Sequence, residues 1–197
     1  IKKQDLFGWF STRMIGMHNL KNCLAAIAVA DHLGLTPQDI AEALAGFGGV
    51  RRRQEIRGEK RGIVVIDDFA HHPTAVRETL AGVRNHFKNN RIIAVFEPRT
   101  NSSMRKVFQN DYAGVFDPAD RICIRKPSML QKVPEGERFS SRRLVADLTQ
   151  RGKAAAHFDD TEAIIDDLVR TSVSGDIILI MSNGGFDNIH ERLLDAL

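Results

Sequence analysis

From residue 63 onward the sequence alternates short apolar runs with longer segments whose apolar residues recur at helical spacing. Runs of this length and composition are typical of strands buried on both faces of a sheet. The predicted strands are 63–66, 92–96, 121–124, 154–158 and 177–181. The predicted helices are 74–87, 103–116, 141–151, 162–172 with Thr161 as its N-cap, and a last one ending at Leu197. Five strand–helix units in succession favour an α/β fold with a mainly parallel sheet and helices on both faces.

The residues before this alternation follow a different, helical pattern. One helix is predicted from Asn19 to the stop at Gly34, and a second begins after Thr36, which is its expected N-cap. The charged segment 51–55 follows these helices and precedes an expected edge strand. We therefore predict a domain boundary here, with one unit over 1–50 and another over 51–197.

The composition is that of an ordinary globular protein, with 43% hydrophobic and 27% charged residues. A net charge of +3 and the lack of clustered basic and aromatic residues argue against a nucleic-acid partner. No apolar stretch approaches the roughly 20 residues of a membrane span, and no signal peptide is recognised. Cys23 and Cys123 lie far apart in apolar runs, which is typical of reduced cysteines. We expect a cytoplasmic chain, cut from a longer protein, that binds neither nucleic acid nor a membrane.

In a parallel sheet with right-handed crossovers, every loop from a strand to the next helix lies at the same edge. Three of these loops carry reactive or charged side chains, and they are 67–74, 97–103 and 182–188. In open α/β sheets, ligands bind in the crevice beyond the carboxyl ends of the strands. The topology therefore predicts that these three loops converge on one site.

The loop 67–74 is the densest of the three in chemical groups. Asp67 and Asp68 could bind a ribose, a cation or an ammonium group, or one of them could only cap the following helix. Asp68 is the better ligand candidate if Asp67 is half buried in the strand. His72, one of two adjacent histidines, could position an anion or transfer a proton, whereas no third ligand stands at zinc spacing. Thr74 could bind a substrate or simply cap the helix.

Other polar groups have both a functional and a purely structural interpretation. Arg99 would suit a carboxylate or a phosphate, or it could be a solvated surface residue. Gly184 and Gly185 permit a close approach of the backbone to a ligand. Asn19 and Asn22 stand three positions apart, so their amides could contact an adenine edge, although Asn19 could equally be an N-cap. The sequence has no G-x-x-x-x-G-K-[ST] motif, so a bound ATP would need its phosphates held by another domain.

Taken together and in this order, these motifs resemble those of the Mur ligase family. The family pattern is matched by G-x-H-N-x-x-N at 16–22, by the arginines near the predicted boundary and by D-D-x-x-H-H-P-T at 67–74. FEPRTNSS at 96–103 and MSNGGF-x-x-IH at 181–190 are most similar to the family member that recycles murein peptides. The resemblance covers essentially the whole chain, but only the last part of the family's protein.

The resemblance implies an organisation and a reaction. Residues 1–50 would be the end of a central P-loop ATPase domain, and residues 51–197 would be the C-terminal Rossmann-like domain. The implied reaction is ATP-dependent and ADP-forming, and it joins UDP-N-acetylmuramate to the murein tripeptide L-Ala-γ-D-Glu-meso-diaminopimelate in peptidoglycan recycling. ATP and Mg²⁺ would be bound mainly by the central domain, so this chain would be inactive alone.

The resemblance also implies which residues contact the nucleotide. Asn19 and Asn22 would contact adenine, and Asp68 would hold the ribose. Arg53, at the hinge between the two units, would reach the nucleotide, with Arg52 as the competing choice.

A second group of residues would serve the peptide substrate. His72 would act in catalysis, and Thr74 beside it would face the incoming amine. The tripeptide pocket would be lined by Arg99, Asn101, Ser182, Asn183, Gly184, Gly185 and Phe186. This chain departs from the family member in one place, because Asp187-Asn188 follow Phe186 where that member has two glycines. The alternatives are another Mur-type amino acid ligase and a non-catalytic module that binds a nucleotide or a muropeptide.

Overall fold

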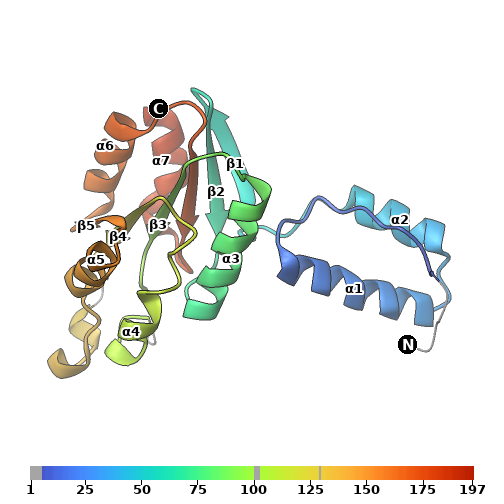
Figure 1. Cartoon of the computed structure of the whole chain (residues 1–197), viewed down its shortest axis with the longest axis horizontal. Helices are drawn as coiled ribbons and strands as arrows, with labels where there is room; N and C mark the ends of the chain where they lie inside the picture. The colour runs from blue at the N-terminus through green and yellow to red at the C-terminus, as the bar shows by residue number, and fades with distance from the viewer. Residues whose placement is uncertain (1–5, 100–102, 129) are drawn as a thin grey trace.

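The computed structural model describes residues 6–99, 103–128 and 130–197 and contains a six-stranded sheet (Figure 1). The strands lie in the order β1-β2-β6-β3-β4-β5. Their bounds are β1 Glu55–Lys60, β2 Ile63–Asp68, β3 Ile92–Phe96, β4 Arg121–Arg125, β5 Ala154–Phe158 and β6 Ile177–Met181. β1 is antiparallel to β2, and all the other neighbouring strands are parallel. The predicted α/β fold with a mainly parallel sheet is confirmed.

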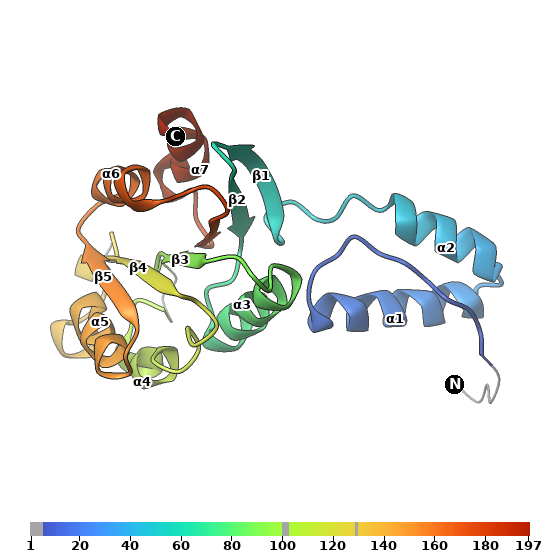
Figure 2. The same ribbon diagram turned by 45° about the horizontal axis from the view of Figure 1, so that its top comes forward.

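Helices cover both faces of this sheet (Figure 2). One face carries α3 Pro73–His86, α4 Gln109–Tyr112 and α5 Ser141–Gln150, and the other carries α6 Thr161–Thr171 and α7 Ile189–Ala196. Because successive strand residues point to opposite faces, Ile66 packs against the first group of helices and Val65 against the second. Every residue of β3 and β6 is buried, as expected for central strands covered on both sides.

The helix predicted near 103–116 is much shorter than expected. A 3₁₀ turn at Lys106–Phe108 leads into α4, which ends at Tyr112. Before the turn, the Met104 carbonyl accepts a hydrogen bond from the Phe139 N–H at 2.8 Å, which holds the chain away from helical geometry. Met104 and Tyr112 are nevertheless both buried. A succession of turns therefore produces the apolar spacing that a helix would also have.

The N-cap of α6 is Asp160, and the predicted cap Thr161 is wrong. The Asp160 carboxylate accepts a hydrogen bond from the Ala163 N–H at 2.9 Å. The Thr161 hydroxyl donates to Asp187 at 2.7 Å and so binds the loop after β6 instead. Both residue types are good caps, and the carboxylate makes the stronger bond to a helix N-terminus.

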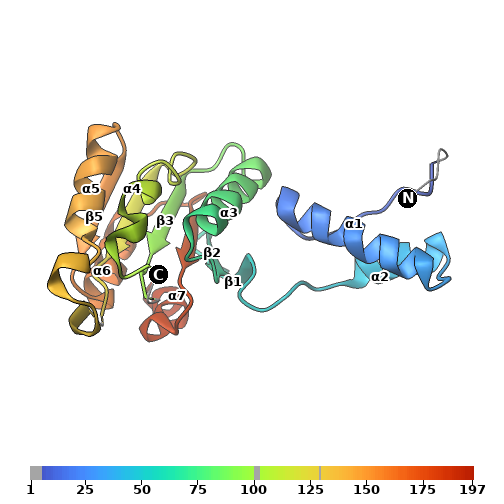
Figure 3. The ribbon, with the colours of Figure 1, turned by 90° about the horizontal axis from the view of Figure 1, so that it is seen from below.

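The helices α1 Met17–His32 and α2 Pro37–Gly46 form a helical pair beside the sheet, joined to it by an extended linker (Figure 3). α2 begins as predicted, because Thr36 and Asp39 exchange side-chain-to-backbone hydrogen bonds in a capping box. The start of α1 approaches α3 at Gly16 and Gly82. A Cβ atom on Gly82 would lie 3.0 Å from the Gly16 Cα atom, so a side chain at this position would push the two segments slightly apart.

Candidate functional site

The three loops predicted to converge do meet at the carboxyl edge of the sheet. The Ser182 N–H donates to the Asp68 carbonyl at 3.1 Å, and the Glu97 N–H donates to the Met181 carbonyl at 3.1 Å. The Ser182 hydroxyl donates to the Glu97 carboxylate at 2.6 Å. The ends of β2, β6 and β3 therefore form one hydrogen-bonded surface.

Asp68 is the last residue of β2 and is only 3% exposed. Its carboxylate accepts hydrogen bonds from the Ala70 N–H at 2.7 Å, the Gln54 N–H at 2.9 Å and the Thr79 hydroxyl at 3.2 Å. Burial raises the pKa of Asp68, although these hydrogen bonds act in the opposite direction. The carboxylate thus orders both the linker and the entry into α3.

Asp67 is buried even more completely than Asp68, at 1% exposure, and is surrounded by basic side chains. Arg52 and Arg57 each place a nitrogen 3.4 Å from its carboxylate, and His190 Nε2 lies 3.3 Å away. Burial raises the pKa of Asp67, but His190 and the two arginines outweigh burial and leave the pKa below its ordinary value. Asp67 is an internal counterion, so Asp68 remains the acid at the cavity described below.

Arg52 connects the linker to the loop after β6. Its Nη2 atom donates to the carbonyl oxygens of Ser182 and Gly184, both at 2.6 Å. The guanidinium also lies over the Phe69 ring, 5.3 Å from its centre. Arg52 was the competing choice for a nucleotide contact, whereas the structure commits its guanidinium to the protein's own backbone.

The loop after β6 has three consecutive residues in the left-handed region. Phe186, Asp187 and Asn188 have φ angles of 47°, 51° and 57°. Glycine adopts such angles without strain, Asn and Asp at a small cost, and Phe at a larger one. Asp187-Asn188 therefore hold a backbone conformation that a pair of glycines would favour.

Two features of this loop offset its strain. The Asp187 carboxylate accepts hydrogen bonds from Arg125 at 2.6 Å and from Thr161 at 2.7 Å. Phe186 is fully buried in the core beneath α6 and α7. Its side chain therefore belongs to the core, and the predicted pocket contact could come only from its backbone.

Arg99 lies directly against Gly184. A Cβ atom on Gly184 would come within 2.3 Å of the Arg99 Cδ atom, so any other residue there would displace the end of the Arg99 side chain from this position. Arg99 also lies 3.8 Å from the carboxylate of Glu97, which is fully buried and bound by Arg125. The structure thus brings Arg99 together with the loop that contains Ser182, Asn183, Gly184 and Gly185, whereas Asn101 lies outside the described residues.

Glu97 and Arg125 are central to this site but were not assigned a role from the sequence. Glu97 directly follows the apolar strand β3, and Arg125 is the last residue of β4, so the position at a strand's carboxyl end was the available signal. Arg125 joins the two loops around it, because it contacts Glu97 on one side and Asp187 on the other. Its side chain is only 9% exposed.

His72, not Thr74, is the N-cap of α3. The His72 Nδ1 atom accepts a hydrogen bond from the Thr74 N–H at 3.4 Å. The His72 ring packs edge-on against Phe108, with 4.6 Å between ring centres. Both His72 and Thr74 are exposed, so both side chains are accessible at the start of the helix.

A cavity of about 590 Å³ lies between α1, the linker and the start of α3. Its volume is within the usual range for small-molecule sites, about 300–1,000 Å³. Six residues predicted to bind nucleotide or substrate line this cavity: Asn19, Asn22, Arg53, Asp68, His72 and Thr74. His18 and Glu78 also line it and were not predicted. Residues from both sides of the predicted domain boundary are thus gathered around one space.

The two asparagines of this cavity have different surroundings. Asn19 is buried, and its amide donates to the Ile15 carbonyl at 2.8 Å and to Gln54 Oε1 at 3.3 Å. Asn22, one turn later, is exposed. Arg53 is exposed as well, with its guanidinium 5.4 Å from the centre of the Phe69 ring. Asn19 is therefore engaged with the protein, while Asn22 and Arg53 present their polar groups to the cavity.

Metal-binding and membrane-spanning features were sought in residues 6–99, 103–128 and 130–197. Within these ranges, no group of three or more His, Cys, Asp or Glu side chains is arranged to hold a metal ion. Within the same ranges, none of the helices combines the length and the apolar character needed to cross a bilayer.

The fold and the site define a class of protein. A family model described as "Mur ligase, glutamate ligase domain" matches residues 52–184, and the chain belongs to the Mur ligase family. It is 41% identical, over 93% of its length, to the Escherichia coli UDP-N-acetylmuramate–L-alanyl-γ-D-glutamyl-meso-2,6-diaminoheptandioate ligase. It also superimposes on the Psychrobacter arcticus murein peptide ligase with a TM-score of 0.70, 32% identity and 99% coverage of this chain.

Family members with another substrate are somewhat less similar. The UDP-N-acetylmuramate–L-alanine ligase of Caldanaerobacter subterraneus is 34% identical over 95% of this chain. The chain spans 38% of the Escherichia coli ligase, 40% of the Psychrobacter arcticus ligase and 40% of the Caldanaerobacter enzyme. It thus corresponds to about two fifths of the length of these relatives.

Proposed function

We propose that this chain is the C-terminal part of an ATP-dependent, ADP-forming ligase that joins UDP-N-acetylmuramate to L-Ala-γ-D-Glu-meso-diaminopimelate. The observation that carries the proposal is the cavity lined by Asn22, Arg53, Asp68, His72 and Thr74. Similarity to the two murein peptide ligases supports the choice of substrate. The reaction would serve peptidoglycan recycling, and hence cell wall biogenesis, in the cytoplasm.

In this proposal, residues 1–50 end the central ATPase domain and residues 51–197 form the C-terminal domain. The exposure of apolar side chains in α1 supports the first assignment. Leu20 and Leu24, which lie one turn apart on the same face, are 48% and 61% exposed. Apolar helix faces of this kind are normally covered by another element of the same domain.

Nucleotide binding would use the cavity between the two units. Asn22 offers an amide that can both donate to and accept from an adenine edge. The Asp68 carboxylate already accepts three hydrogen bonds within the protein, so a ribose hydroxyl would be its fourth donor. The positive charge of Arg53 is suited to the nucleotide's phosphates. Asn19 would support the site indirectly, by holding Gln54 of the linker.

Amine and acyl group would meet at the start of α3. His72 Nδ1 accepts the Thr74 N–H at 3.4 Å, which favours the neutral tautomer with its proton on Nε2. In that form His72 donates a hydrogen bond, so it would hold an oxygen of the acyl group and would not take the amine's proton. Thr74 would orient the amine through its hydroxyl. The chain's contribution to the rate is positioning of the two reactants.

The peptide's carboxylates would bind along the loop after β6. Arg99 is 34% exposed beside Gly184, and Arg52 holds the loop's carbonyls inward. The Gly184 N–H already donates to the Ser182 hydroxyl at 3.0 Å, so the Gly185 N–H would be the backbone group that approaches the peptide, without a side chain in between. A guanidinium next to such a backbone suits a carboxylate.

ATP would supply the phosphoryl group that activates the muramoyl carboxylate. The cavity fits a base and a ribose in volume and in polar groups, but the sequence has no P-loop for the phosphates. The described residues also provide no cluster of ligands for Mg²⁺. We therefore assign phosphate and Mg²⁺ binding mainly to the central domain, and we expect this chain alone to be inactive.

The test uses the ligase that contains this chain. It should form ADP when ATP, UDP-N-acetylmuramate and the tripeptide are all present. Arg99→Ala should raise the KM for the tripeptide more than the KM for ATP, and an equal rise of both would contradict the peptide assignment. ADP formation with L-alanine in place of the tripeptide would instead support the alternative that the relative at 34% identity suggests, an amino acid ligase.

A further inference from the structure

A second cleft, of about 350 Å³, lies at the carboxyl ends of β4 and β5 and beside the N-terminus of α5. We call it the α5 cleft; its lining includes Lys126, Arg138, Ser140, Arg142 and His157. Since β3, β4 and β5 are parallel neighbours, this cleft opens at the same sheet edge as the site described above.

The α5 cleft is strongly basic. Lys126 follows β4, Arg138 comes from the loop before α5, Arg142 lies on α5, and His157 lies on β5. Burial lowers the pKa of His157, and the positive charge of Arg142 lowers it further. The acid among the lining residues, Glu135, is 90% exposed and lies 3.6 Å from Arg138. Cationic groups from three separate segments thus converge on one concave surface beside the His157 imidazole, and Lys126 also lies 3.6 Å from the Asp159 carboxylate.

The N-terminus of α5 adds hydrogen-bond donors to these charges. Ser140 is the N-cap of this ten-residue helix and accepts the Arg143 N–H at 3.1 Å. The N–H groups of the first turn that this cap does not bind carry the positive end of the helix dipole. A carboxylate in the cleft would therefore meet both side-chain cations and helix N–H groups.

Arg125 physically joins the α5 cleft to the peptide site. Its carbonyl accepts the Ser141 hydroxyl at 3.1 Å on the cleft side. Its guanidinium contacts Glu97 and Asp187 on the side of the loops after β3 and β6. A ligand lying along those loops would reach the α5 cleft as its next neighbour.

The length of the proposed peptide substrate matches the distance from the start of α3 to the α5 cleft. Three strand spacings separate β2 from β4 in the sheet, or about 14 Å at about 4.8 Å each. An extended tripeptide spans about 10 Å before its last side chain is counted. With its amine at the start of α3, the long side chain of its third residue would cover the remaining distance.

From this geometry we infer that the α5 cleft binds the side-chain carboxylate of the peptide's terminal diamino dicarboxylic acid. The inference rests on the proposed function, since it names the part of the substrate that the cleft recognises. Arg142 and Lys126 are then specificity-determining residues that discriminate this peptide from one ending in lysine, which lacks that carboxylate.

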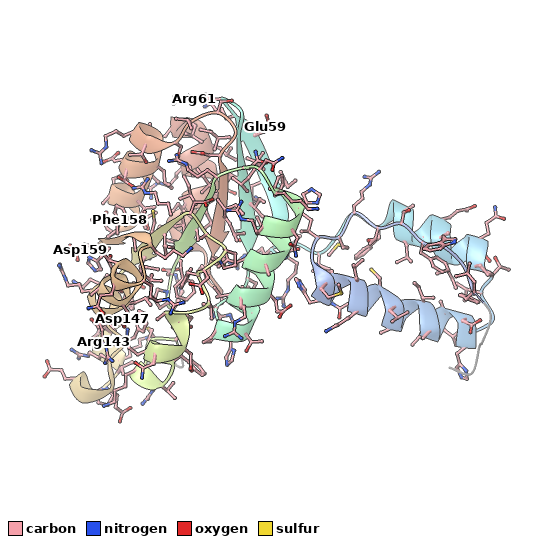
Figure 4. All side chains as sticks on the ribbon, viewed as in Figure 1. Glu59, Arg61, Arg143, Asp147, Phe158 and Asp159 are labelled. Carbon is pink, nitrogen blue, oxygen red and sulfur yellow. The ribbon has the colours of Figure 1, made fainter. Side chains whose placement is uncertain are left out.

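The α5 helix provides a matched control. Arg143 is adjacent to Arg142 and also exposed, but it points to Asn110 at 3.1 Å and to Asp147 at 3.9 Å and does not line the cleft. Figure 4 labels Arg143 and Asp147 on α5, and Phe158 and Asp159 at the end of β5.

The experiment compares kcat/KM of the ligase for tripeptides ending in meso-diaminopimelate and in L-lysine. Wild-type enzyme should favour the diaminopimelate peptide, and Arg142→Ala or Lys126→Met should reduce that preference by roughly tenfold, the effect of one charge-assisted hydrogen bond. Arg143→Ala should leave the preference unchanged. The substitutions should leave KM for UDP-N-acetylmuramate unchanged as well.

The outcomes separate this inference from the proposed function. If the ligase accepts the tripeptide but both cleft variants keep the full preference, the α5 cleft is only a solvated basic surface. Equal use of both peptides by wild-type enzyme would overturn the inference in the same way. A rise in KM for UDP-N-acetylmuramate alone would assign the cleft to that substrate's diphosphate and also contradict it. Failure to ligate either peptide would reject the proposed function, and the inference with it.

Discussion

Arg52 and Ser182 are 130 positions apart in the sequence, yet the Arg52 guanidinium donates a 2.6 Å hydrogen bond to the Ser182 carbonyl. The same nitrogen reaches the Gly184 carbonyl, and the Asp67 carboxylate, 3.4 Å from Arg52 Nε, neutralises the guanidinium charge. The linker that follows the helical pair is thereby tied to the proposed peptide loop. A movement of the linker would therefore be transmitted to the loop by the Arg52 side chain.

Replacing Arg52 by lysine should loosen this connection. A lysine ammonium keeps the charge but cannot reproduce the planar geometry that contacts two carbonyls and Asp67 together. We expect the free energy of unfolding to fall by about 1–3 kcal/mol, measured by urea denaturation. Arg51→Lys, at the exposed neighbour on the same linker, is the control and should change it by less than about 0.5 kcal/mol. Equal effects at both positions would argue against the connection.

Asp67 should give the unfolding free energy a dependence on acidic pH. Its pKa in the folded state lies below the ordinary value, so its ionised form contributes stability above about pH 4, where an unfolded aspartate titrates. That contribution is lost as pH falls through the lowered pKa. Wild-type protein should exceed Asp67→Asn by about 2–4 kcal/mol at neutral pH, with the difference shrinking below about pH 4. A difference that stays constant with pH would show that Asp67 acts by packing alone.

The strained loop after β6 offers a pair of glycine substitutions with opposite outcomes. Asn188→Gly relieves a left-handed residue and should raise the free energy of unfolding by about 0.5 kcal/mol. Asp187→Gly relieves similar strain but removes the partner of Arg125 and Thr161, so it should lower stability by about 1 kcal/mol. Thermal unfolding of both variants tests the contrast. If both gain stability, the contacts of Asp187 contribute little.

Substituting the two asparagines of the cavity should distinguish an effect on nucleotide binding from an effect on protein stability. Asn22→Ala should weaken ADP binding to the ligase by about 2–10-fold, as measured by calorimetry, without changing its unfolding. Asn19→Ala should lower the free energy of unfolding by about 1–3 kcal/mol, because it leaves the Ile15 carbonyl and Gln54 without their donor. Unchanged ADP affinity in Asn22→Ala would remove Asn22 from the nucleotide site.

Much of the fold could be predicted because the central strands β3 and β6 are buried on both faces. The runs at β3 and β6 are uniformly apolar, and among the described residues no other five-residue element is. The helix prediction for 103–116 failed because Met104 and Tyr112 are buried by turns, and these turns pair with the segment around Phe139. A long-range contact of this kind leaves no periodic signal in the sequence.

The candidate site was predictable as a set of loops but not as a set of contacts. Topology alone brings Asp68 and Ser182 to one edge. Nothing in the spacing of residues distinguishes Arg52, which binds backbone carbonyls, from the exposed Arg53. Phe186 likewise sits in a glycine-rich loop, yet its ring is in the core. Such assignments depend on side-chain directions that only the assembled sheet defines.

The approach of Gly16 to Gly82 has a thermodynamic consequence. Residues without side chains bring little apolar surface to the contact between the helical pair and α3, so little hydrophobic free energy opposes its separation. A ligand in the cavity touches both sides, and at about 100 times its Kd it would add about 2.7 kcal/mol to the joined state. Nucleotide concentration, more than protein packing, would then decide how much time the two units spend together.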